Sequence, residues 1–158
     1  MPMIANALSC MPYNPLRDFN YKVEAEATYV IYLGTHEATQ KVEDPNKDRS
    51  RLQQGIEFSV PVKFTARALN RNGLQEEESF TGQVSLSCAG PWCAGYGDVT
   101  KPTVLFLKKT PQGFVREIGP CDGFHAEADE EEVLTALKKC LRRGRCSEQQ
   151  IQKFERWN

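Results

Sequence analysis

The segment FSVPVKFTARA, residues 58–68, decides the fold class because apolar and polar residues alternate along it. Side chains of a β-strand point to opposite faces in turn, so this pattern predicts a long strand with one buried face. Pro61 falls on the polar face, and because proline cannot donate to a strand ladder it indicates an edge or a bulge. The predicted buried side chains are Phe58, Val60, Val62, Phe64, Ala66 and Ala68.

Four other segments around this strand are also predicted to be extended. The pair Asn72–Gly73 supplies the positive φ of a tight hairpin turn, after which the alternation resumes. The run of β-branched, aromatic and aliphatic residues at 29–33 is typical of a buried strand, which we expect to end at Gly34. The remaining predicted strands cover residues 80–88, 103–107 and 114–118.

Helices are predicted at both ends of the chain. Asn14 is a suitable cap before Pro15, which predicts a short helix beginning in residues 14–19. Four acidic residues at 129–132 begin an amphipathic helix that Gly144 can end, and Ser147–Gln150 has the pattern of a capping box. We therefore expect an α+β fold, mainly β, with a five-stranded OB-type barrel, a short N-terminal helix and two C-terminal helices.

Length and charge limit the organisation and the function classes. The chain has 158 residues, which suits one domain over residues 10–158 with a C-terminal helical hairpin over about residues 129–158. Residues 1–9 are either a flexible start or a leader remnant, because Ala7–Ser9 has the small-x-small form of a cleavage site. A net charge of −1 argues against nucleic-acid binding, and no apolar run is long enough for a membrane span.

Six cysteines in a chain of this size favour disulfide bonds, and hence a secreted or periplasmic protein. Zinc is disfavoured because there is no C-x-x-C pair and only two histidines, His36 and His125, so we expect no metal and no cofactor. No P-loop, HExxH or GxSxG pattern is present, which argues against an enzyme. A disulfide between Cys140 and Cys146 would hold the corner between the two C-terminal helices.

Several residues occur in the order found in a known family. Cys10–Pro12 precedes a short helix and the alanine-led strand Ala27–Gly34, and later Ser87–Gly90, the strand 103–107 and Ile118–Cys121 follow in turn. In this order of landmarks the chain resembles the netrin-like domain family, which includes the tissue inhibitors of metalloproteinases. Two features depart from the family: Pro12 stands where the inhibitors have a second cysteine, and Cys93 has no counterpart.

The resemblance implies an OB barrel and an extracytoplasmic binding module that acts by protein–protein interaction, with a zinc metalloprotease as one partner. With this resemblance we pair Cys10 with Cys121, and we pair Cys88 with Cys93 locally and Cys140 with Cys146 at the helix corner, with Cys10–Cys88 left open as an alternative. In the inhibitors the first cysteine chelates the protease zinc through its free α-amino group and carbonyl oxygen. Cys10 would take that role after cleavage behind Ser9; otherwise it is a structural cysteine.

Further candidate contacts follow from the residues themselves. Met11 and Pro12 would accompany Cys10 in a partner-binding segment, and Trp92 and Tyr96 form either an exposed aromatic tip or a packed corner. The basic residues Lys138, Lys139, Arg142 and Arg143 either contact a polyanion or complement the helix dipole. The alternative function is a small thiol-redox protein or enzyme that uses Cys88 and Cys93.

Overall fold

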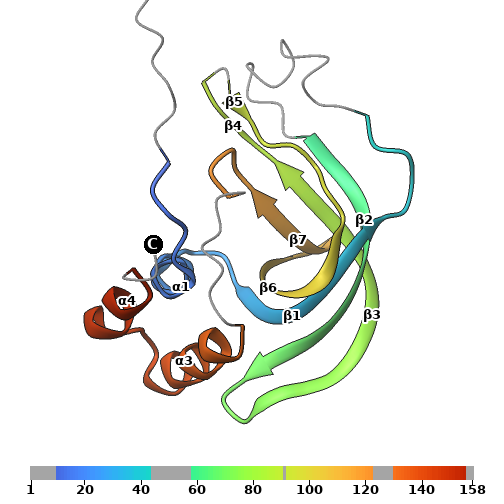
Figure 1. The fold of residues 1–158 in the computed structure, drawn as a ribbon. Coiled ribbons are helices and arrows are strands. Elements are labelled where there is room, and N and C mark those ends of the chain that lie inside the picture. Colours follow the sequence, from blue (N-terminus) through green and yellow to red (C-terminus); the bar gives the residue numbers. More distant parts are fainter. Residues whose placement is uncertain (1–9, 44–57, 91, 123–129, 156–158) are drawn as a thin grey trace, which may run out of the picture.

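Five strands form a closed barrel in the computed structural model, which describes residues 10–43, 58–90, 92–122 and 130–155 (Figure 1). Their order around the barrel is β1-β2-β3-β7-β6, and β6 pairs back to β1. Every pair is antiparallel except β3–β7, which is parallel. The strands are β1 (Tyr29–Ala38), β2 (Phe58–Asn70), β3 (Gly73–Leu86), β6 (Val99–Thr110) and β7 (Gly113–Ile118).

Three helices lie together on one side of the barrel (Figure 1). They are α1 (Pro15–Glu24), α3 (Glu130–Arg143) and α4 (Glu148–Glu155). The two-residue strands β4 (Cys88–Ala89) and β5 (Trp92–Cys93) form a small hairpin between β3 and β6. The predicted α+β class, mainly β and with helices at both ends of the chain, is confirmed, and α1 continues beyond the predicted segment to Glu24.

The barrel interior is the face that the alternation in β2 predicted. Val62 and Phe64 are completely buried, and the equivalent residues of the neighbouring strands pack against them. Opposite Phe64 on β3 lies Phe80, whose ring stacks on it at a centroid distance of 5.3 Å. Pro61 lies just beyond the last β1–β2 pair, where its missing N–H costs no ladder bond to β1, and its carbonyl accepts a bond from the Thr39 amide at 3.0 Å.

Gly34 does not end the first strand, contrary to the sequence prediction, since β1 continues to Ala38. Gly34 lies instead where β1 is packed closely against Ala66 of β2. A Cβ added there would lie 2.5 Å from the Cα of Ala66 on the adjacent strand. The glycine is therefore required by the close contact between two strands, and not by a turn.

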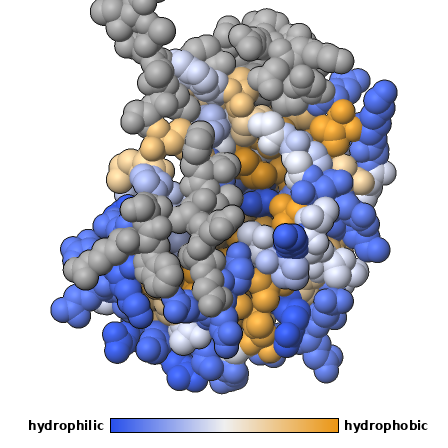
Figure 2. All heavy atoms as spheres, in the orientation of Figure 1, coloured by the Kyte–Doolittle hydropathy of each residue, from blue (hydrophilic) through white to orange (hydrophobic). Residues whose placement is uncertain are grey.

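The outer face of the barrel forms a second apolar core against the helices. Ile31 and Phe106 point outward from the barrel into this core, and so does Leu69, which follows the inward-facing Ala68 on β2. Leu16 and Phe19 of α1 and Leu137 of α3 cover them, among others. The outer surfaces of α3 and α4, at the lower left of Figure 1, are mostly hydrophilic in Figure 2.

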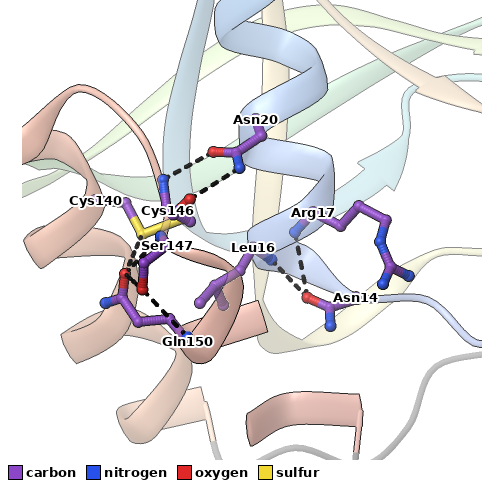
Figure 3. The surroundings of a disulfide bond; sticks show 8 residues. All are labelled: Asn14, Leu16, Arg17, Asn20, Cys140, Cys146, Ser147 and Gln150. Atoms are coloured by element: carbon purple, nitrogen blue, oxygen red, sulfur yellow. Dashed lines mark hydrogen bonds between the residues drawn. A yellow bond between two sulfur atoms is a disulfide. The ribbon is translucent and has the colours of Figure 1, made fainter. Parts of the chain in front are cut away.

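Two asparagines, Asn20 of α1 and its N-cap residue Asn14, fasten the C-terminal helices, and Figure 3 shows the bonds of Asn20 to Cys146. The amide of Asn20 donates to the Cys146 carbonyl at 3.0 Å and accepts from the Cys146 N–H at 2.8 Å. Asn14, whose Oδ1 caps α1, donates through Nδ2 to the Ile151 carbonyl at 3.0 Å. The predicted capping box is confirmed, because the Ser147 N–H donates to Gln150 Oε1 and the Gln150 N–H donates to Ser147 Oγ.

Candidate partner-binding site

Strand directions bring several predicted site residues to one end of the barrel. Because β1 runs antiparallel to β2 and β6, and β3 runs parallel to β7, the C-terminal ends of β1, β3 and β7 lie together. We call this the upper end, and it is uppermost in Figure 1. The N-terminal segment 10–14, the β4–β5 hairpin and the residues that follow β7 all lie there.

All six cysteines form disulfides, and the three pairs are those suggested with the family resemblance. Cys10 binds Cys121 across a sequence separation of 111 residues, with a Cα–Cα distance of 5.4 Å. The other two bonds are local and join Cys88 to Cys93 and Cys140 to Cys146. The alternative pairing of Cys10 with Cys88 is wrong.

The N-terminal segment holds Met11 and Pro12 exposed between two fixed points. On one side Cys10 is bonded to Cys121, and on the other Asn14 Oδ1 accepts from two backbone N–H groups of α1 at 3.1 and 3.2 Å. Between them Met11 is 72% exposed and Pro12 is also exposed. Since the chain is fixed on both sides, these apolar residues are presented with little freedom left to lose on binding.

The β4–β5 hairpin presents a third apolar residue at the same end. Trp92 is 40% exposed, and Cys88 and Cys93, directly opposite in the hairpin, are bonded below it. The hairpin is fixed to β7 because the N–H of Ser87 donates to the Ile118 carbonyl at 3.0 Å. Three residues further along the chain Cys121 holds Cys10, so the hairpin and the N-terminal segment are both attached to the stretch 118–121.

Tyr96 does not belong to an exposed tip with Trp92. Its hydroxyl donates to Asp98 Oδ1 at 2.7 Å, and its ring lies 5.7 Å from that of His36, centroid to centroid. It packs partly buried against the barrel interior. Of the two predicted arrangements, the exposed aromatic residue holds for Trp92 and the packed corner holds for Tyr96.

A directional chain of hydrogen bonds runs from the barrel interior to the upper end. Arg116 can only donate, so its Nη1–H donates to His36 Nε2 at 2.7 Å, and the imidazole proton is on Nδ1. Nδ1 donates to the Tyr96 oxygen at 3.3 Å, and Tyr96 in turn donates to Asp98. Asp98 also accepts a hydrogen bond from the N–H of Ala38 at 2.9 Å, so this series of hydrogen bonds reaches the last residue of β1.

Burial keeps this chain in one protonation state. His36 is 2% exposed, and burial together with the nearby Arg116 cation lowers its pKa to about 4. Burial also lowers the pKa of Arg116, and burial and the bond to Asp98 raise that of Tyr96. At neutral pH the chain therefore links a cation to a carboxylate through a neutral imidazole and a neutral phenol.

The sequence analysis did not identify His36 and Arg116 as residues of the barrel interior. The signal was present in the alternation, because His36 has the same parity as the inward-facing Tyr32. Arg116 likewise lies between the inward-facing Phe114 and Ile118 on β7. The prediction that the first strand ended at Gly34 hid the position of His36.

Two basic residues of α3, Lys139 and Arg142, have described surroundings. Arg142 donates through Nε to the Arg71 carbonyl at 3.1 Å, beside the β2–β3 turn. Lys139 lines a different hollow, of about 450 Å³, that it shares with Glu131 and Glu132. Neither observation tests the binding of a polyanion, so a polyanion site on this stretch stays a prediction.

Other candidate chemistry finds little in the described part of the chain. Within residues 10–43, 58–90, 92–122 and 130–155, no three His, Cys, Asp or Glu side chains are placed to share a metal ion. In the same residues no helix combines the length and hydrophobicity that a bilayer crossing needs. The disulfide of Cys88 and Cys93 lies on a hairpin, whereas a redox thiol is usually activated at a helix N-terminus. His125, Trp157 and residues 1–9 lie outside the described residues.

Comparison with known proteins gives no relative for this chain. No family model, no curated protein and no solved structure matches it. The functional inference therefore depends on the residues and their arrangement.

Proposed function

We propose that the protein is a secreted or periplasmic binding module of the netrin-like type, which contacts a protein partner through the upper end of its barrel. The observation that carries the proposal is the placement of Met11, Pro12 and Trp92. They are exposed apolar residues on two segments that disulfides hold and that share the attachment stretch 118–121. Exposed tryptophan and rigid apolar segments are frequent anchors of protein interfaces.

The strand order supports an OB-type barrel. When only the barrel strands are counted along the chain, their order is 1-2-3-5-4, where the fourth is β6 and the fifth is β7. Two successive hairpins, β1–β2 and β2–β3, are followed by a crossing that places β6 beside β1. This is the Greek-key connection expected of an OB-type barrel. The crossing passes through the β4–β5 hairpin at the upper end.

The disulfides support an oxidising compartment. Three bonds involve every cysteine of the chain, and such bonds persist outside the reducing cytosol. The same oxidised state favours a structural role for Cys88 and Cys93 over thiol-redox catalysis.

Within this proposal the partner is a zinc metalloprotease and the contact is inhibitory. A chain that begins at Cys10 would present a free α-amino group with an ordinary pKa near 8, partly neutral at physiological pH and able to bind zinc together with the Cys10 carbonyl. Met11 and Pro12 would then lie along the protease cleft. The bond from Cys10 to Cys121 would fix the direction of this segment.

The test compares three oxidised forms of the protein against a panel of zinc metalloproteases: a chain starting at Cys10, the same chain acetylated at its α-amino group, and the chain starting at Met1. We expect inhibition by the first form alone. Equal inhibition by all three forms would contradict chelation, and no inhibition by any form would contradict the assignment of a protease partner.

Substitutions test the surface independently of chelation. Met11→Asp should abolish inhibition by the chain starting at Cys10, because it places a charge in the centre of the apolar segment. Tyr21→Asp is the matched control, since Tyr21 is 67% exposed but lies on α1 and outside the proposed surface. Equal loss with both substitutions would argue against contact through the upper end.

A further inference from the structure

An apolar groove lies between the helices and the barrel, away from the upper end. It is bounded by α1, the start of β1, the β2–β3 turn and the end of α3, and its volume of about 640 Å³ is within the range of ligand pockets. Its lining includes Phe19, Ile31, Leu69 and Phe106, which are side chains of the outer core, with Val23 and Leu141 beside them.

The charges of the groove are all of one sign. Of the residues that line it, only Lys22 and Arg71 carry a charge, and both are cations. The Lys22 ammonium lies 3.3 Å from Asp18 and 4.5 Å above the centre of the Tyr29 ring. Arg71 is exposed in the β2–β3 turn, and within the described ranges of the chain its guanidinium has no acidic partner.

A third cation, Arg142, lies beside the β2–β3 turn that carries Arg71. Arg142 reaches the β2–β3 turn and donates to the Arg71 carbonyl at 3.1 Å, which leaves the Arg71 side chain itself unengaged by this bond. Cations beside an apolar groove attract an anionic ligand and disfavour a cationic one.

We propose that this groove binds one anionic amphiphile, with its acyl or aryl portion on the apolar side chains and its carboxylate or sulfonate at Arg71 and Lys22. The apolar portion covers the side chain of Val23, which is 51% exposed, and reaches the edges of the buried Phe19, Leu69 and Phe106, while the charged group remains near water. Neutral and cationic molecules of the same shape lack the electrostatic attraction to Arg71 and Lys22. The site lies away from Met11 and Trp92, so this inference does not depend on the proposed partner-binding function.

The binding test uses 8-anilinonaphthalene-1-sulfonate as the probe and follows its fluorescence on titration into the oxidised protein. We expect saturation at one probe per chain, an unchanged near-ultraviolet circular dichroism spectrum, and displacement of the probe by dodecanoate below its micelle concentration. Dodecyltrimethylammonium, with the same chain length and the opposite charge, should displace it much less. Equal displacement by the two surfactants overturns the charge assignment.

Two matched pairs of variants locate the site. Val23→Asp should weaken probe binding at least tenfold, whereas Tyr21→Asp on the same helix lies outside the groove and should leave it unchanged. Arg71→Gln should weaken it about two- to five-fold, an effect that salt reduces, and Arg143→Gln should not. Probe binding that neither Val23→Asp nor Arg71→Gln weakens overturns the proposal. A dimer that is seen in sedimentation equilibrium and that the probe dissociates also overturns it, because the groove would then belong to the contact with a second copy of the chain.

Discussion

His36→Gln tests the physical description of the barrel interior. Glutamine offers Arg116 an uncharged oxygen acceptor but does not titrate. In the folded protein the pKa of His36 is lowered to about 4, against an ordinary value of 6.5. A difference of about 2.5 pH units, at about 1.4 kcal/mol per unit, corresponds to about 3 kcal/mol of free energy of unfolding.

The sign follows from which state binds the proton. As the pH falls below 6.5 the unfolded chain protonates this histidine, while the folded protein keeps it neutral until about pH 4. The stability from the neutral imidazole is therefore fully present above pH 6.5 and is lost progressively down to about pH 4. The groups that join His36 in this series of hydrogen bonds are present in both wild type and variant, so their titration affects the two proteins alike. They are Tyr96, Asp98 and Arg116.

The assay is urea unfolding of the oxidised wild-type and His36→Gln proteins between pH 4 and pH 7. We expect wild type to lose about 3 kcal/mol more than the variant over this interval. His125→Gln serves as the control for the other histidine of the chain. In NMR spectra one of the two imidazoles should stay neutral, with its proton on Nδ1, down to about pH 4.

Parallel pH dependence of wild type and His36→Gln would refute this reasoning. A His36 imidazole that titrates near pH 6.5 would do so as well, because it would mean that the folded protein hydrates this side chain.

Two further predictions concern the barrel and its cross-links. Gly34→Ala should lower the free energy of unfolding, measured in urea, by about 3 kcal/mol, because its Cβ would lie 2.5 Å from the Cα of Ala66. Gly97→Ala is the control and should change the free energy of unfolding little, because no atom lies within 4 Å of the new Cβ. Similar losses at the two positions would contradict the close-contact argument. Replacing Cys10 and Cys121 by serine should lower the free energy of unfolding by about 5 kcal/mol, against about 2 kcal/mol for the same change at Cys140 and Cys146. The reason is loop entropy, because the first bond spans 111 residues and the second spans 6. The reverse order of the two losses in thermal unfolding would show that local contacts dominate.

The fold was largely predictable because its strands are half buried. Alternation in residues 58–68 assigned the inward face of β2 correctly, and the Asn72–Gly73 pair marked the hairpin that follows. The capping pattern at Ser147 located the start of α4. In each case the signal is local, since side-chain direction, turn conformation and capping are all decided by residues that are near one another in the sequence.

The interior hydrogen bonds were not predictable by the same means, because they join residues far apart in the chain. His36, Tyr96 and Arg116 lie on three separate segments, and each alone resembles an ordinary polar residue. The two asparagine contacts of α1 with Cys146 and Ile151 are likewise long-range. The groove was missed for a related reason, since its walls come from α1, α3 and three strands.

The interior hydrogen bonds also bear on the upper end, because the same piece of chain takes part in both. Trp92 is exposed, but Ala94 two residues later is buried and its N–H donates to the Ser87 carbonyl at 2.9 Å. Tyr96 then enters the chain of bonds to His36. The stretch from hairpin to β6 is thus fixed at both of its ends, by the Cys88–Cys93 bond and by the barrel interior. A buried histidine and a partly buried arginine cost stability that an apolar pair would not, and here they hold in place the segment that presents Trp92.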